Sequence, residues 1–395
     1  MFFTLYAAED GSTFNEYLSV ITACILSFLS GIHAGWTSPY IPKLLNSEDY
    51  PFKISNEAAS YIAIFGPIGD VFGAVLSMVL VDRIGRRNSL IILGTPMLFS
   101  SLLIYFSYLS PAFLYIARLC GGISFGTVSS IITMYNSEIS RPSIRGKSGV
   151  IVVFLYTPGV IVVNVFGNYF TMYEMAIFSA AVSVFFLYTF LQIPETPYYL
   201  LMKGKLEAAE KSLRFFRRIQ NVEEELQILI LVVQRQLSES RKFKDIFVIE
   251  HNRRALSLMF FGRIIQQMTG GMAFLMYAQY LLAESSDFMQ PQFAVLVISL
   301  LQTFVTPFCG YCADRFGRVP LLTFPTAACS VCLILLGVYF SLKDYPNLSL
   351  PVFCPVLFLG LFFINYQFGL CSILSIVLGE LFSTLLNQKP FVLST

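Results

Sequence analysis

Five polar side chains lie inside long apolar stretches of this 395-residue sequence and are candidates for binding a small molecule: His33, Gln266, Gln267, Tyr277 and Gln302. A glutamine amide both donates and accepts hydrogen bonds, which suits a ligand that carries many hydroxyl groups. Tyr277 lies eleven residues beyond Gln266, about three turns further if one helix continues. The alternative is that the glutamines form hydrogen bonds between neighbouring helices.

His33 is the candidate that could exchange a proton, because an unperturbed imidazole has a pKa of about 6.5. The alternative is a neutral imidazole bonded to a backbone carbonyl or to the ligand. Asp70 is a carboxyl group in a second apolar stretch, and it could pack against Arg118 or line water.

A charged motif occurs twice. Residues 82–87 read Asp-Arg-Ile-Gly-Arg-Arg, and residues 314–318 read Asp-Arg-Phe-Gly-Arg, 232 positions later. A glycine at the turn allows two helices to approach closely, and the guanidinium groups can bind carboxylates of neighbouring helices in a bidentate manner. Repetition of the motif predicts a chain built from two similar halves.

Three glutamates at the ends of apolar stretches could accept those guanidinium groups, and a further arginine follows the first of them. We predict that these charged residues form a gate of ion pairs. The candidates are Asp82, Arg83, Arg86, Arg87, Glu138, Arg145, Glu195, Asp314, Arg315, Arg318 and Glu380.

Metal, cofactor and enzyme chemistry find no support in the sequence. Two Cys-x-x-Cys pairs, at 309–312 and 329–332, have a formal zinc spacing, but they lie in apolar stretches without the turns that would bring four thiolates together. There is no Ser/His/Asp arrangement and no phosphate-binding glycine-rich loop. We therefore expect no metal, no cofactor and no enzymatic activity.

The composition indicates a membrane protein. The chain is 56% hydrophobic and 13% charged, with a mean hydropathy of +0.69, whereas a soluble domain is roughly 25% charged. The net charge of +2 gives no field that would attract nucleic acid. Apolar runs of about 20 residues match the length of a membrane-spanning helix.

We predict an all-α membrane protein, because a backbone in lipid must satisfy its own hydrogen bonds. Ten spans are expected, at 18–39, 60–81, 89–109, 112–135, 148–167, 174–193, 255–282, 292–313, 319–341 and 352–378.

The loop charges predict the orientation of the spans. Of the 26 Lys and Arg residues, 20 fall in one set of alternate loops and 3 in the other. Positively charged loops face the cytoplasm, so both termini and the long loop 203–254 are expected there. Amphipathic helices are expected in that loop, and the predicted domains are a six-helix bundle at 1–200, a cytoplasmic helical linker at 201–254 and four further spans at 255–395.

Several stretches resemble the sugar porters of the major facilitator superfamily, particularly insect facilitative trehalose and hexose transporters. In order along the chain, these are Gly35–Pro39, the two Asp-Arg-x-Gly-Arg loops, Arg118-x-x-Gly121-Gly122, Tyr135-x-x-Glu138, Arg145-Gly146, Pro194–Leu200, Gln266-Gln267-x-Thr269-Gly270 and Gly379–Phe382.

The resemblance implies a major facilitator fold of two helical bundles and facilitative uniport of a sugar, trehalose or a hexose, by alternating access at the plasma membrane. It implies that Gln266 and Gln267 face a central cavity and that Gln302 contacts sugar. In proton-coupled members of the family, a position similar to His33 carries an aspartate. The expected partners are therefore a sugar and the lipid bilayer.

The chain also departs from the family pattern, which usually has twelve spans. Its second bundle is expected to be incomplete, lacking the last two helices. The chain as written is therefore expected to transport sugar poorly or not at all. The Gly-Pro-x-Pro-Trp stretch of the tenth span is replaced by residues 371–375, and Met272 replaces a span-seven asparagine. The alternatives are a truncated, non-transporting homologue that acts as a sensor or assembly partner, and a proton-coupled sugar symporter.

Overall fold

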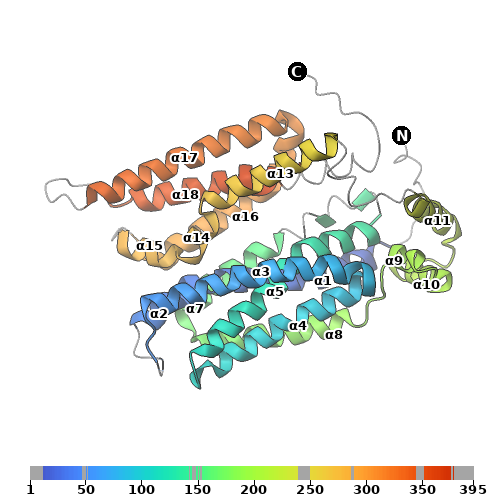
Figure 1. Ribbon diagram of the computed structural model, residues 1–395, viewed down its shortest axis with the longest axis horizontal. Helices are drawn as coiled ribbons and strands as arrows, with labels where there is room; N and C mark the ends of the chain where they lie inside the picture. The colour runs from blue at the N-terminus through green and yellow to red at the C-terminus, as the bar shows by residue number, and fades with distance from the viewer. Residues whose placement is uncertain are drawn as a thin grey trace. The chain divides into compact units, whose positions relative to one another are not determined.

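The structure, a computed structural model, describes residues 12–46, 50, 52–141, 143–144, 148–149, 151, 154–238, 250–285, 289–343, 351–374 and 377. Its contacts divide the chain into two compact units, Met1–Ser240 and Arg241–Thr395. Figure 1 shows both units as packed helices.

The first unit contains most of the long helices. Its helical elements are α1 (Phe14–Gly35), α2 (Thr37–Asn46), α3 (Asn56–Ile84), α4 (Arg86–Tyr105), η1 (Phe106–Tyr108), α5 (Ala112–Ile139), α7 (Tyr156–Tyr169), α8 (Met172–Phe190), α9 (Pro197–Met202), α10 (Leu206–Arg217) and α11 (Glu223–Ser238).

The second unit contains shorter and more interrupted helices. Its elements are α13 (Glu250–Met268), α14 (Gly271–Met276), α15 (Ala278–Ser285), α16 (Pro291–Phe316), α17 (Arg318–Lys343), α18 (Cys354–Tyr366) and η2 (Gln367–Ile373).

Seven helices among the described residues are long and apolar enough to cross a membrane. They run over Phe14–Leu45, Asn56–Ile84, Arg86–Tyr108, Ala112–Ile139, Met172–Phe190, Arg318–Lys343 and Cys354–Ile373. The other three predicted spans correspond to α7, to the interrupted run α13–α15 and to α16, whose apolar part is Pro291–Thr306. The count of ten therefore stays a prediction.

Small residues set the close packing of α3 on α5. A Cβ atom added to Gly69 would lie 3.0 Å from the backbone nitrogen of Ile123, so a larger residue would force the two helices apart. Such small residues allow membrane helices to gain van der Waals contact in lipid, where water provides no hydrophobic drive between them. On the other side of α3, Phe72 is 59% exposed and Met78 is 71% exposed, as expected for a lipid-facing surface.

The repeated motif forms the same turn in both units. Gly85 joins α3 to α4 with a φ of 97°, and Gly317 joins α16 to α17 with a φ of 84°. A side chain at a positive φ is strained, which explains a glycine at the same place in both copies. The sequence repeat is therefore a structural repeat.

The predicted continuous span at 255–282 is wrong. Gly270 adopts a left-handed conformation with a φ of 73°, ending α13, and a second irregular residue, Tyr277, separates α14 from α15. Tyr277 consequently does not continue the helix that carries Gln266. The sequence prediction missed this break because a single glycine hardly changes the hydrophobicity of an apolar run.

The linker helices α9, α10 and α11 belong to the first unit. They share a small core of Ala209, Leu213, Val222 and Leu226. The amphipathic helices expected in the long loop are thus found at α10 and α11. The division at residues 200 and 254 remains a prediction.

Candidate functional site

A buried ion pair connects the first charged motif to α5. The guanidinium Nε of Arg86 donates to Oε1 of Glu138 at 2.8 Å, with the two side chains 5% and 9% exposed. The other carboxylate oxygen of Glu138 accepts from the Thr196 hydroxyl at 2.6 Å. A weaker contact of 3.6 Å joins Arg86 to Asp82, which is exposed. Three segments distant in sequence therefore meet at one carboxylate.

Glu195 binds the start of α4 through the backbone. Its carboxylate accepts from the amides of Arg86 at 3.0 Å and Arg87 at 2.9 Å. A carboxylate at a helix N-terminus is stabilised by the free amides there and by the helix dipole. Gly85 lies directly beside this carboxylate, which leaves no room for a side chain. Its positive φ is a second, independent reason for a glycine at this position. Arg83 contributes its carbonyl, which accepts from the Tyr199 hydroxyl at 2.8 Å.

The second charged motif is described only in part. Arg315 lies at the end of α16, where NH1 is 3.5 Å from the Tyr311 hydroxyl, and Arg318 begins α17. The side chain of Asp314 lies outside the described structure, as do Arg145 and Glu380. The pairings predicted for these three residues are therefore outside the described residues.

Polar side chains of the second unit meet between α13 and α18. Gln266 is buried, and Arg263 donates to its Oε1 at 2.7 Å. Tyr366 of α18 lies close to the Gln266 side chain. The ring of Tyr366 stacks on that of Phe362, with centroids 5.7 Å apart. An amide, a guanidinium, a hydroxyl and aromatic faces thus lie together.

A second polar contact joins α16 to η2. Nε2 of Gln367 donates to the Thr306 hydroxyl at 3.1 Å, and that hydroxyl donates to the backbone carbonyl of Gln302 at 2.8 Å. η2 is a π-helix. Such segments are rare and are found frequently at functional sites.

The other sequence-predicted ligands differ in exposure. Gln267 is exposed, in contrast to its buried neighbour Gln266, because adjacent helix positions point about 100° apart. Gln302 is half-buried within α16, and Tyr277 is half-buried at the break after α14.

His33 lies in the first unit and contacts Arg118. Nδ1 of the imidazole is 3.1 Å from NH1 of Arg118, and this NH1 also donates to the His33 carbonyl at 2.5 Å. Arg118 therefore packs against His33. Asp70 lies elsewhere, beside Gly126 of α5.

A second buried network, not predicted from the sequence, connects α1 to the linker helices. Glu16 is fully buried and pairs with Arg141 and Arg217, each at 3.0 Å. Arg217 also pairs with Glu225 at 2.7 Å. Burial lowers the pKa of Arg217, but the two carboxylates have the larger combined effect, so the pKa is raised. One sequence feature could have indicated this network: the acidic residue Glu16 lies just before the first predicted span.

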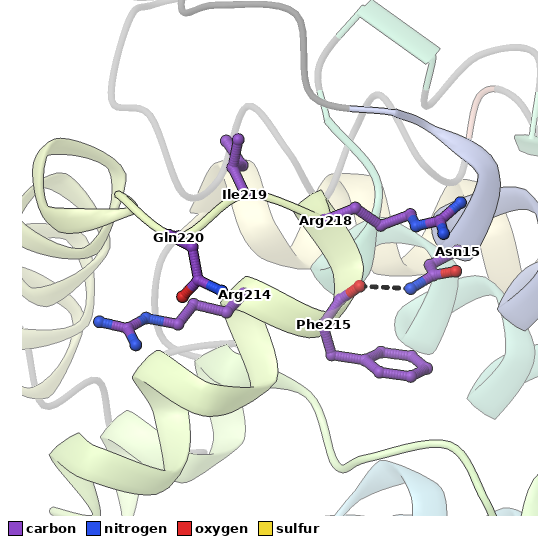
Figure 2. Close-up of a pocket in the computed structure, with 6 residues that line it drawn as sticks. All are labelled: Asn15, Arg214, Phe215, Arg218, Ile219 and Gln220. Atoms are coloured by element: carbon purple, nitrogen blue, oxygen red, sulfur yellow. Dashed lines mark hydrogen bonds between the residues drawn. The ribbon is translucent and has the colours of Figure 1, made fainter.

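A neighbouring contact involves the first turn of α1. Nδ2 of Asn15 donates to the carbonyl of Phe215 at 2.6 Å, as Figure 2 shows. A surface cavity of about 290 Å³ lies here, and its lining residues are Asn15, Arg214, Phe215, Arg218, Ile219 and Gln220. The guanidinium groups of Arg214 and Arg218 point away from each other (Figure 2), so they do not converge on one ligand.

Comparison with known proteins agrees with the resemblance. The family described as sugar (and other) transporter matches residues 19–395. The facilitated trehalose transporter of Apis mellifera ligustica is 23% identical, over 93% of this chain and 73% of its own length. That of Culex quinquefasciatus is 25% identical, over 96% of this chain and 74% of its own length.

Solved structures show the same fold. A partially occluded, inward-open xylose transporter from Escherichia coli has a TM-score of 0.71 at 20% identity, covering 93% of this chain and 90% of that one. A major facilitator superfamily proton:xylose symporter has a TM-score of 0.70 at 19% identity, covering 93% of this chain and 83% of that one. This family is a class of transporters rather than of enzymes. The chain therefore belongs to the sugar transporter family, as a multi-pass membrane protein with the major facilitator fold.

Proposed function

We propose that this protein is a facilitative uniporter that moves trehalose or a hexose across the plasma membrane by alternating access. The cluster around Gln266 carries this proposal. The Gln266 amide is held by Arg263 before the ligand arrives, and this reduces the entropy cost of binding. The two insect relatives are facilitated trehalose transporters, which supports a disaccharide or hexose as cargo.

The proposed substrate-contacting side chains are described for each unit by itself. Gln267 is exposed and available to sugar hydroxyls, while Gln266 supplies the ordered polar wall next to it. Gln302 and Tyr277 are half-buried and complete the set in the second unit. In the first unit, the proposed substrate-contacting side chain is His33.

The charged residues at the cytoplasmic helix ends form the proposed gate. The bonds of Glu138 to Arg86 and Thr196, and those of Glu195 to the start of α4, join α4, α5 and the start of α9. The proposed role of Asp82, Arg83 and Arg87 is in the same network, and that of Arg145 follows the family pattern. Arg315, Arg318, Asp314 and Glu380 are proposed to form the matching gate of the second unit.

Uniport is preferred to proton symport because of what surrounds His33. Its ring contacts a guanidinium, so a second positive charge on the imidazole would be repelled at 3.1 Å. A carboxylate in the place of the guanidinium would instead stabilise a protonated imidazole, as proton transport requires. Sugar flux is therefore expected to follow the sugar gradient alone.

The test is uptake of radiolabelled trehalose and glucose in cells that express the full chain, compared with cells that carry an empty vector. We expect weak but saturable uptake that unlabelled trehalose or glucose competes away, unchanged when a protonophore collapses the proton gradient. Uptake that the protonophore abolishes would favour the symporter instead. Surface-exposed protein with no saturable uptake of either sugar would contradict the proposal.

A further inference from the structure

Two cysteine side chains of the second unit lie in the contact between α16 and η2. Cys309 of α16 is 1% exposed, and Cys371 of η2 is half-buried. The Cys309 thiol lies close to Cys371 and to Ser372. Neither cysteine belongs to the proposed sugar site or to the proposed gate. Two thiols that face each other across a helix contact can be oxidised to a disulfide.

The register of the two helices can be followed from two contacts. A Cβ atom added to Gly360 of α18 would lie 3.7 Å from Cγ1 of Ile298 in α16. Further along both helices, Nε2 of Gln367 donates to the Thr306 hydroxyl at 3.1 Å. The second contact is displaced by a similar number of residues in each helix and in the same direction. The helices α16 and α18, with η2 at its end, therefore run parallel, and both belong to the second unit (Figure 1).

The next turn of this contact brings Cys309 to Cys371. Cys309 follows Thr306 by three residues, which is a little under one turn of an α-helix. Cys371 follows Gln367 by four residues, nearly one turn of the wider π-helix. Gly369, two residues from both Gln367 and Cys371, lies against α17. Gln367 and Cys371 therefore share the other side of η2.

Close packing of helices brings facing residues within reach of a disulfide. Packed helices have axes about 8–10 Å apart with Cα atoms about 2.3 Å from each axis, so facing Cα atoms lie about 3.5–5.5 Å apart. A disulfide joins Cα atoms that are about 4.4–6.8 Å apart. These ranges overlap, and α16 packs directly on η2. A bond between Cys309 and Cys371 is thus compatible with the packing of the two helices.

The surroundings of the two thiols differ and assign their order of reaction. The Arg263 guanidinium lies close to the Cys371 thiol. Burial opposes ionisation of a thiol, whereas a neighbouring positive charge favours the thiolate, which is the reacting form. Cys309 is more deeply buried, and its Sγ donates to the Val305 carbonyl at 3.4 Å. Cys371 is therefore the thiol that reacts first, and Cys309 is the thiol that closes the bond.

We propose that Cys309 and Cys371 are a dithiol site at which a hydroperoxide forms a reversible disulfide between α16 and η2. The Cys371 sulfur attacks one peroxide oxygen, the O–O bond breaks, and the thiol proton leaves with the other oxygen. The resulting sulfenic acid is attacked by the Cys309 sulfur, and its hydroxyl leaves as water. With hydrogen peroxide, two thiols are oxidised to one disulfide and one peroxide is reduced to two water molecules.

Both cysteines lie near the helix ends that are predicted to face the cytoplasm. Glutathione keeps thiols reduced there, so a disulfide in this place is transient and reports oxidation. The bond would fix η2 beside Arg263, which binds Gln266 at 2.7 Å. An effect of oxidation on sugar binding rests on the proposed function, whereas formation of the bond does not.

The test maps the oxidised pair by mass spectrometry. Purified full-length protein in detergent is reduced, freed of reductant and treated with hydrogen peroxide until the exposed Met268 is converted to its sulfoxide. N-ethylmaleimide then blocks the remaining thiols before digestion. We expect a predominant linkage between Cys309 and Cys371 that dithiothreitol removes. Both cysteines still carrying N-ethylmaleimide, or a predominant linkage of either one to Cys312, would overturn the proposal.

Two variants and one control assign the roles of the thiols. Cys309→Ala leaves the sulfenic acid without the thiol that closes the bond, so Cys371 should react with dimedone several-fold more than in the wild type. Cys371→Ala should abolish disulfide formation at Cys309. Cys312→Ala is the matched control, because Cys312 is also half-buried and lies in the same helix, three residues from Cys309. The control should form the linkage to the wild-type extent.

Circular dichroism and size-exclusion chromatography confirm that each variant is folded before oxidation. A folded Cys309→Ala variant with unchanged dimedone labelling at Cys371 would contradict the order of reaction. If neither site variant folds, the map of the wild-type protein decides. The readout is a bond between sulfur atoms and does not depend on sugar transport, so the proposed uniport and the dithiol site can fail separately.

Discussion

Removing the Glu138 carboxylate should strongly destabilise the end of the first unit that is predicted to face the cytoplasm. Glu138→Ala deletes an ion pair whose two side chains are 5% and 9% exposed, and it leaves the Thr196 hydroxyl without its acceptor. Breaking a buried pair by removing one partner costs about 3–5 kcal/mol, because the remaining charge stays buried. The unfolding midpoint of the purified protein should fall accordingly, and a cysteine probe at the cytoplasmic mouth should label faster.

The matched control is Glu210→Ala, which removes the partner of Arg214. That pair is also arginine–glutamate, but its side chains are 45% and 38% exposed. Solvent screens such a pair, so it contributes about 0–1 kcal/mol. Equal midpoints and equal labelling for the two variants would show that burial of the Arg86–Glu138 pair has no energetic consequence.

Three further predictions concern the ligand, the turn and the topology. Gln267→Ala should raise the KM for sugar while leaving the melting temperature unchanged, since the side chain is exposed; a lower melting temperature with normal KM would make Gln267 structural. Gly85→Ala should destabilise the protein more than Gly204→Ala, because both have a positive φ but only Gly85 lies against a carboxylate; thermal unfolding of both variants measures the difference, and equal shifts would contradict it. Asn347, in an Asn-Leu-Ser sequon on the predicted outer side, should be accessible to glycosylation. A shift in mobility after endoglycosidase treatment measures glycosylation at Asn347. Labelling of a C-terminal tag from outside intact cells would contradict the predicted orientation.

Long apolar runs allowed most helices to be predicted from the sequence. Spans at 60–81 and 319–341 lie within α3 and α17, since no glycine of positive φ interrupts either run. The break at Gly270 was missed because it depends on one backbone angle. Hydrophobicity is a sum over many residues, so it is insensitive to a single irregular one.

Side-chain partners were predicted less well than helices. The motifs indicated that Glu195 lies near the Arg-rich turn, but its carboxylate binds backbone amides rather than guanidinium groups. The contact of His33 with Arg118 joins residues 85 positions apart. Such pairings depend on the rotation of each helix about its axis, and residue type alone does not define that rotation.

The buried network of Glu16 has a consequence for the biosynthesis of the protein. Glu16 lies at the start of α1, whereas Arg217 is made about 200 residues later. During this interval the carboxylate must remain hydrated or bind another group. We therefore expect α1 to reach its final position only after the linker has been translated. A ribosome stalled before residue 217 should hold α1 in a form that a membrane chaperone can still bind.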